Sequence, residues 1–234
     1  MGGLFVLCEW FMKFTVVNLL WLLFSFPIVL LGFNLFFIED IKGVLAILIL
    51  MVVLLPFTFF PATTAMFAMA REWVFKDYEG NPLVKSFWHF YKENYKRSLA
   101  NGLLGTAIWS IWMIDVYYFY VNHYYLFLTF LTMGIVLFVL TINLFSVTVH
   151  FKMSIWKSLK SAFFITIGGP VLFLAIAISS GIVIYMSFNM FLFLIPFLTG
   201  SLIAFLSFSA FYSRYIKLID GMHDSENRNN NGCI

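Results

Sequence analysis

Long uncharged apolar stretches alternate with short segments that hold most of the charged residues of the chain. A transmembrane helix needs about 20 mostly apolar residues to cross about 30 Å of hydrocarbon. Four stretches each supply one crossing, and the uncharged stretch 161–213 is long enough for two, with a turn at 186–190. The pattern therefore predicts an all-α, polytopic membrane bundle of six transmembrane helices, at about 14–38, 43–70, 98–122, 124–149, 161–186 and 190–213.

This bundle forms a single predicted domain over residues 1–220. The residues that follow, 221–234, are polar and rich in Asn. Such a segment cannot bury enough apolar surface to fold by itself. A disordered cytoplasmic tail is therefore predicted after the bundle.

Two prolines interrupt the second predicted span. Residues 43–70 would form a helix of about 42 Å, which is longer than the hydrocarbon is thick, so this span should tilt or break. Pro56 and Pro61 each remove a backbone donor and clash with the preceding helical turn. We expect a kink near the inner membrane surface, with the hydroxyls of Thr63 and Thr64 bonding to the carbonyls that the prolines free.

Residues 84–97 carry two neighbouring stripes at helical spacing. The apolar and aromatic stripe holds Val84, Phe87, Trp88, Tyr91 and Tyr95, and the cationic stripe holds Lys85, His89, Lys92 and Lys96. This pattern predicts an amphipathic helix in the cytoplasmic interface, acting either as a plain anchor or as a docking surface. A shorter segment of the same kind lies at 150–160.

The positions of Lys and Arg predict the orientation of the bundle. Loops rich in these residues stay on the cytoplasmic side. With the N-terminus inside, thirteen of the fourteen Lys and Arg residues fall on that side, and only Lys42 falls outside. We therefore expect both ends in the cytoplasm. A hydrophobic content of 62%, a charged content of 11% and a mean hydropathy of +0.96 agree with a multi-pass membrane protein.

Asp115 is the only acid well inside a predicted span. An ionised carboxylate is costly there, so we expect it to face the bundle, carry a proton or pair with another group. Uncharged polar residues in the spans are candidates for hydrogen bonds between helices, namely Asn18, Asn34, Asn143 and Ser146.

The common catalytic and metal-binding motifs are missing from the sequence. It has no Gly-rich phosphate loop, no His-Glu-x-x-His and no Gly-x-Ser-x-Gly, and its two cysteines lie near opposite ends. We predict no enzymatic activity, no cofactor and no metal site. The cations fall where the topology places them, which argues against nucleic-acid binding.

Three segments carry a resemblance to a known family: NLLWLLFSFPIVLLG at 18–32, FPATTAMFAMAREWV at 60–74 and SFWHFYKENYKRSLANGLLG at 86–105. Their Pro-Ala-Thr-x-Ala core and Phe-Trp-x-x-(Phe/Tyr)-Lys-x-Asn segment resemble the YesL-like family. This is an integral membrane family of Gram-positive bacteria whose domain has no known function. Its members are commonly encoded beside ABC-type importers and hydrolases for plant-derived oligosaccharides.

The resemblance implies a non-catalytic auxiliary subunit of an ABC-type carbohydrate importer in the bacterial cell membrane. Such a subunit would pack against the permease subunits and reach the ATPase only indirectly, with lipid as its other partner. The alternative is an independent small transporter or channel that uses Asp115. The candidate partner contacts are Pro61, Ala62, Thr63, Phe87, Trp88, Tyr91, Lys92 and Tyr95.

Overall fold

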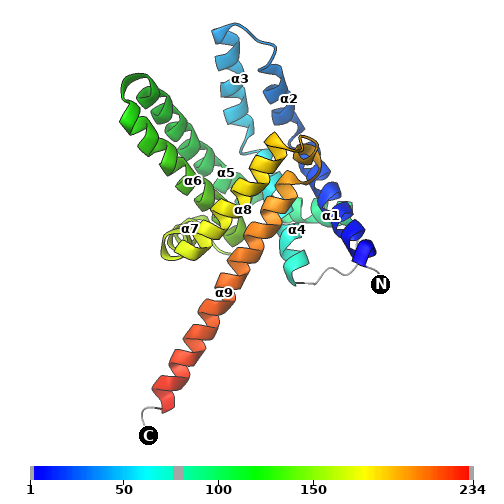
Figure 1. Cartoon of the computed structure of the whole chain (residues 1–234), viewed down its shortest axis with the longest axis vertical. Helices are drawn as coiled ribbons and strands as arrows, with labels where there is room; N and C mark the ends of the chain where they lie inside the picture. Colours follow the sequence, from blue (N-terminus) through cyan, green and yellow to red (C-terminus); the bar gives the residue numbers. More distant parts are fainter. Residues whose placement is uncertain (1–2, 76–81, 232–234) are drawn as a thin grey trace.

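A computed structural model describes residues 3–75 and 82–231 of the chain, and the prediction of an all-α fold is confirmed there. These residues form helices and no strand. Figure 1 shows them as α1 (Gly3–Phe24), α2 (Phe26–Asn34), α3 (Ile41–Leu54), α4 (Phe59–Phe75), α5 (Leu83–Asn122), α6 (Tyr124–His150), α7 (Ile155–Gly168), α8 (Pro170–Asn189), the π-helix η1 (Ile195–Thr199) and α9 (Gly200–Asn231).

Five segments of the described chain are long and apolar enough to cross a membrane. A sixth crossing results if α3 and α4 together form one span, bent by 48°. The number of candidate spans therefore reaches the predicted six, and the chain has the character of a multi-pass membrane protein. The five unbroken segments are Gly3–Phe24, Leu83–Asn122, Tyr125–His150, Pro170–Asn189 and Ile195–Leu218.

The bend between α3 and α4 lies at Pro56, as the sequence predicts, and not at Pro61. Pro61 stands in the first turn of α4, where a helix needs no backbone donor. The expected role of the threonines is wrong in detail. Thr63 and Thr64 donate their hydroxyls to the carbonyls of Phe59 and Phe60 in their own helix, at 2.7 and 2.9 Å.

Two breaks occur where the apolar pattern indicates none. The first predicted span, 14–38, begins earlier, at Gly3, and is divided at Ser25 into α1 and α2. Pro27 causes this division because it cannot continue α1 but fits the first turn of α2. The fifth span begins at Pro170 and not at 161, because Gly169 and Pro170 separate α7 from α8.

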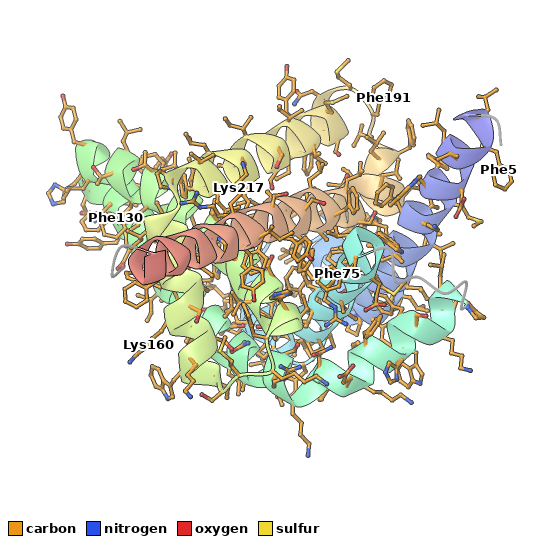
Figure 2. All side chains as sticks on the ribbon, turned by 90° about the horizontal axis from the view of Figure 1, so that it is seen from below. Phe5, Phe75, Phe130, Lys160, Phe191 and Lys217 are labelled. Carbon is orange, nitrogen blue, oxygen red and sulfur yellow. The ribbon has the colours of Figure 1, made fainter. Side chains whose placement is uncertain are left out.

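The predicted interfacial helix and the third span belong to one continuous helix, α5. Its ribbon bends between the part that begins at Leu83 and the part that ends at Asn122, as Figures 1 and 2 show. We call residues 83–97 the first part of α5. Helix α7 is seen end-on in Figure 1 and lengthwise in Figure 2, so it runs across the long axis of the molecule.

The ends of the helices gather in two groups. The α2–α3, α5–α6 and α8–η1 connections lie at the upper end of Figure 1. The N-terminus, the end of α4, the first part of α5 and helix α7 lie below them. We call this lower region the basic end. The end of α4 carries Arg71, the first part of α5 carries Arg97, and the segment after α6 and helix α7 carry Lys152 and Lys160. Which side of a membrane it faces stays a prediction.

Helix α4 forms the centre of the core. Twelve of its seventeen residues are buried, from Phe60 to Trp73. It packs against α1, α5, α6 and α9. Helix α3, its partner in the bent pair, has no buried residue. Helices α2 and α3 form an arm that projects from the upper end of the molecule in Figure 1, and we call it the α2–α3 arm.

Helix α9 runs farther than the predicted span of 190–213. It continues to Asn231, below the rest of the molecule in Figure 1. Helical structure therefore covers most of the segment for which the sequence predicts a disordered tail, while residues 232–234 lie outside the described chain.

Candidate functional site

Two arginines meet the C-terminal end of α6 at the basic end of the molecule. Arg71 of α4 donates through Nη1 to the carbonyl of Val149, and Arg97 of α5 donates through Nη1 to the carbonyl of Phe151 at 3.1 Å. The last carbonyls of a helix have no intrahelical partner and carry the negative end of its dipole. The two guanidinium groups therefore cap α6 and connect it to α4 and α5. We call this group the arginine junction.

Further contacts hold each guanidinium group in place. Arg71 pairs with Glu72 at 2.9 Å and lies 5.7 Å from the ring centre of Phe90. Arg97 donates through Nη2 to Oδ1 of Asn94 at 2.6 Å, and the Asn94 amide donates in turn to the carbonyl of Phe90. Most partners of the two arginines are neutral, so the junction keeps positive charge.

Buried hydrogen bonds continue from the junction into the bundle. Ser98 of α5 donates to Thr64 of α4 at 2.6 Å, and Asn101 of α5 donates to Thr148 of α6 at 2.9 Å. Asn143 of α6 donates to Thr166 of α7 at 2.9 Å. Such bonds contribute about 1 kcal/mol or less each in a membrane, but they determine which helix faces meet.

A second polar junction surrounds Asn18. Its amide donates to the carbonyls of Ile195 and Pro196, at 3.1 and 2.7 Å, and its Oδ1 accepts from the backbone N–H of Ser201 at 3.1 Å. Asn18 is fully buried and thus supplies the partners that irregular backbone requires inside a membrane. A Cβ on Gly200 would lie 2.8 Å from this Oδ1, so the close approach needs glycine.

The other polar residues that were predicted to form hydrogen bonds between helices divide into two groups. Asn143 bridges α6 and α7, as expected. Asn34 and Ser146 instead bond to backbone carbonyls of their own helices, Leu30 and Ile142. In the part of the chain that the structure describes, their side chains make no hydrogen bond to another helix.

The predicted partner contacts have unequal access to the surface. Pro61, Ala62 and Thr63 are buried in α4, and Phe87 is buried in α5. Trp88 and Lys92 are exposed, while Tyr91 and Tyr95 are half-buried. Which of them a partner contacts stays a prediction.

The exposed part of this group forms an aromatic cluster. The rings of Trp88 and Tyr91 stack with 5.7 Å between centroids, and Phe24 of α1 lies 4.7 Å from Tyr91. The ammonium group of Lys92 lies 5.2 Å from the centre of the Trp88 ring. Helix α1 therefore helps to position the first part of α5, with a cation held over an exposed ring.

Asp115 is half-buried in the second half of α5. Neighbouring positions face α6, since Trp112 donates to the carbonyl of Phe130 at 2.9 Å and the rings of Phe119 and Phe130 lie 4.6 Å apart. Among the described residues, the Asp115 carboxylate has no hydrogen bond or ion pair. The structure thus places it at the edge of the α5–α6 interface without bringing another charged group to it.

A shallow depression of about 280 Å³ opens beside the arginine junction. It is lined by Glu93 and Arg97 of α5 and by Lys152 and Met153 of the segment between α6 and α7. Lys152 pairs with Glu93 at 3.1 Å. No group of His, Cys, Asp or Glu that could hold a metal ion occurs in the part of the chain described.

Sequence reasoning missed the arginine junction. Arg71 and Arg97 are separated in the chain, and both bind backbone carbonyls, which no residue pattern reveals. The available signal was their position at the cytoplasmic ends of two predicted spans, and positive charge is expected there in any case.

Comparison with known proteins extends the resemblance seen in the sequence. Residues 14–116 match the family described as "Protein of unknown function, DUF624". The chain is 30% identical over 160 residues to the uncharacterized protein YteU of Bacillus subtilis (strain 168), a match that covers 67% of this chain and 59% of YteU. It therefore spans less than two thirds of the length of that relative.

A second relative is matched over nearly its whole length. The chain is 27% identical over 218 residues to the uncharacterized protein YesL of Bacillus subtilis (strain 168), covering 91% of each. No solved structure matches the chain significantly. The DUF624 match and the two relatives agree with the motifs of residues 18–105. The chain belongs to a YesL-like family.

Proposed function

We propose that this protein is a non-catalytic auxiliary subunit of the bacterial cell membrane that packs laterally against the permease subunits of an ABC-type carbohydrate importer. The observation that supports it is the α2–α3 arm, whose helix α3 buries no residue in its own chain. Side chains along the arm are widely exposed, among them Phe36 at 87% and Ile49 at 66%.

Lipid can cover such side chains but does not position the arm. In a bilayer the hydrophobic effect does not hold helices together, so a helix is oriented by close packing and hydrogen bonds. Among the described residues, α3 packs mainly on α2. It has little close packing and little hydrogen bonding with the rest of the bundle. Helices of a second membrane protein would supply the missing packing.

The importer as the partner rests on the family resemblance. The two reported relatives are themselves uncharacterized and add nothing on this point. The support is the gene neighbourhood typical of the family, together with a lateral surface suited to contact with membrane helices.

Copurification tests the proposal. The full chain is coexpressed with the permease pair of an ABC-type carbohydrate importer from the same bacterium, and the complex is extracted in mild detergent. The variant Leu45→Ala/Ile49→Ala changes one exposed face of α3, while Ile178→Ala/Ile182→Ala makes the same kind of change on exposed positions of α8. We expect the first variant to lose most of the bound permease and the second to keep it.

The outcomes separate two failures. If wild-type protein never retains the permeases, the auxiliary role is wrong. If both variants retain the permeases equally, the arm is not the contact surface, and the permeases bind another face of the protein.

One observation favours a second candidate function, an independent transporter or channel. The half-buried Asp115 carboxylate lacks a charged partner in the described chain, and acids inside membranes often lie on ion or proton paths. In this case Asp115→Asn should abolish flux through the protein in proteoliposomes. Unchanged flux would remove the only residue on which this alternative depends.

A further inference from the structure

Two helical segments at the basic end lie across the long axis of the molecule. Figure 2, seen from below, shows α7 and the first part of α5 lengthwise, on either side of the segment that joins α6 to α7. If the candidate spans cross a membrane, these segments run along its surface. Helices in this position contact lipid headgroups.

Helix α7 has one face toward the bundle and one face away from it. Ser158, Ala162 and Thr166 are buried and lie one turn apart, and Thr166 accepts a hydrogen bond from Asn143 of α6. The opposite face exposes aromatic rings and ammonium groups. It includes Trp156, which is 71% exposed, together with Lys157, Lys160, Phe163 and Phe164.

This mixture of side chains suits the boundary between hydrocarbon and headgroups. Indole rings collect at that depth because one part of the ring is apolar and the N–H is polar. Lysines beside them reach toward phosphates while their methylene groups stay in apolar surroundings. In Figure 2 the side chain of Lys160 points away from the bundle.

The surface around α7 carries a large excess of positive charge. Among the described side chains of residues 83–97 and 151–168, seven are Lys or Arg and one, Glu93, is an acid. Glu93 is already paired with Lys152, whose side chain is still 81% exposed. Arg97 is occupied by Asn94 and by the Phe151 carbonyl. On α7 itself, Lys157 and Lys160 are exposed and form no ion pair with a described residue.

We infer that this surface binds the headgroup of an anionic phospholipid, with Lys157 and Lys160 on its phosphate and Trp156 at the acyl boundary. Charge complementarity points to an anion, and the exposed rings on the same face point to a lipid, since free phosphate has no apolar part to contact them. The arginine junction holds the segment before α7 and so positions the helix. This inference does not depend on the importer as partner.

Lipid retention tests the site. The full chain is reconstituted in nanodiscs with equal amounts of phosphatidylglycerol and phosphatidylcholine. Native mass spectrometry then counts the lipid molecules that stay bound when the protein is released from the nanodisc. The test variant is Lys157→Gln/Lys160→Gln, and Lys157→Arg/Lys160→Arg keeps the charge. The matched control, Lys42→Gln/Lys217→Gln, removes two exposed cations elsewhere.

We expect wild-type protein, the arginine variant and the control to prefer phosphatidylglycerol. A lysine near an anionic surface contributes about a fivefold gain, so the loss of two lysines should lower the preference of the test variant by about 25-fold at low salt. Circular dichroism checks that all variants remain helical.

Three results would overturn the inference. Wild-type protein could retain the two lipids equally, which would exclude selective binding. The control could lose as much preference as the test variant, which would show an effect of total charge. Inorganic phosphate at millimolar concentration could displace the lipid completely, which would identify a free anion as the ligand.

Discussion

The two helices of the bent pair, α3 and α4, have opposite environments. Twelve residues of α4 are buried and none of α3 is, although α3 is the more apolar of the two. Helix α4 contains Ala62, Ala65, Ala68 and Ala70 among its buried residues, together with two bonded threonines. Helix α3 consists mainly of Leu, Ile and Val. In lipid, small and hydrogen-bonding residues bury a helix, and apolar bulk alone does not.

The largest expected effect concerns the charged end of α4. Arg71→Met leaves the Val149 carbonyl and the Glu72 carboxylate without their partner. We expect a loss of about 3 kcal/mol in the free energy of unfolding, because the substitution removes the cation and leaves its half-buried partners unpaired. Lys42→Met, at the exposed start of α3, should change it by less than about 0.5 kcal/mol. Unfolding by SDS titration in mixed micelles measures both, and equal losses would contradict the role of the junction.

Matched alanine positions give the most direct test of the contrast between the two helices. Ala68 in α4 is fully buried and Ala46 in α3 is exposed. Ala68→Leu should lower the free energy of unfolding by about 2 kcal/mol through overpacking, and Ala46→Leu should leave it nearly unchanged. A destabilised Ala46→Leu protein would show that α3 is packed after all.

The close approach of α5 to α4 depends on glycine. A Cβ on Gly102 would lie 3.0 Å from Phe60 and from the Pro56 backbone, whereas a Cβ on Gly181 in α8 would meet nothing within 4 Å. Gly102→Ala should destabilise the protein by about 1 kcal/mol, because the backbone at Pro56 can shift only slightly to make room for the added methyl group. Gly181→Ala should stabilise it slightly, since alanine favours a helix. Thermal unfolding in detergent compares the two, and equal midpoints would argue against the tight contact.

The smallest effect is expected for a single hydrogen bond of α4. A double-mutant cycle with Thr64→Val and Ser98→Ala isolates the bond between these hydroxyls. The coupling energy should be about 0.6 kcal/mol, the average for such bonds in membranes. Additive effects of the two substitutions would mean that this bond does not stabilise the packing of α4 against α5.

The sequence predicts the features that depend on a property shared by a whole segment. The number of candidate spans, the break at Pro56 and the family follow from hydropathy, proline chemistry and motifs. The division at Ser25 and the start of α8 at Pro170 were missed, because both lie within uncharged runs that allow longer helices. The arginine junction was missed because its acceptors are backbone carbonyls.

The amino-acid sequence by itself determined that this chain is a bundle of membrane helices with a basic end, because partition between water, interface and hydrocarbon depends on local composition. Only the tertiary structure decided that α4 is enclosed while α3 stays open, and that Arg71 and Arg97 meet at the end of α6. The physical reason is that an apolar helix is equally well solvated by lipid and by protein. Its position then depends on close packing and a few hydrogen bonds between residues far apart in the chain.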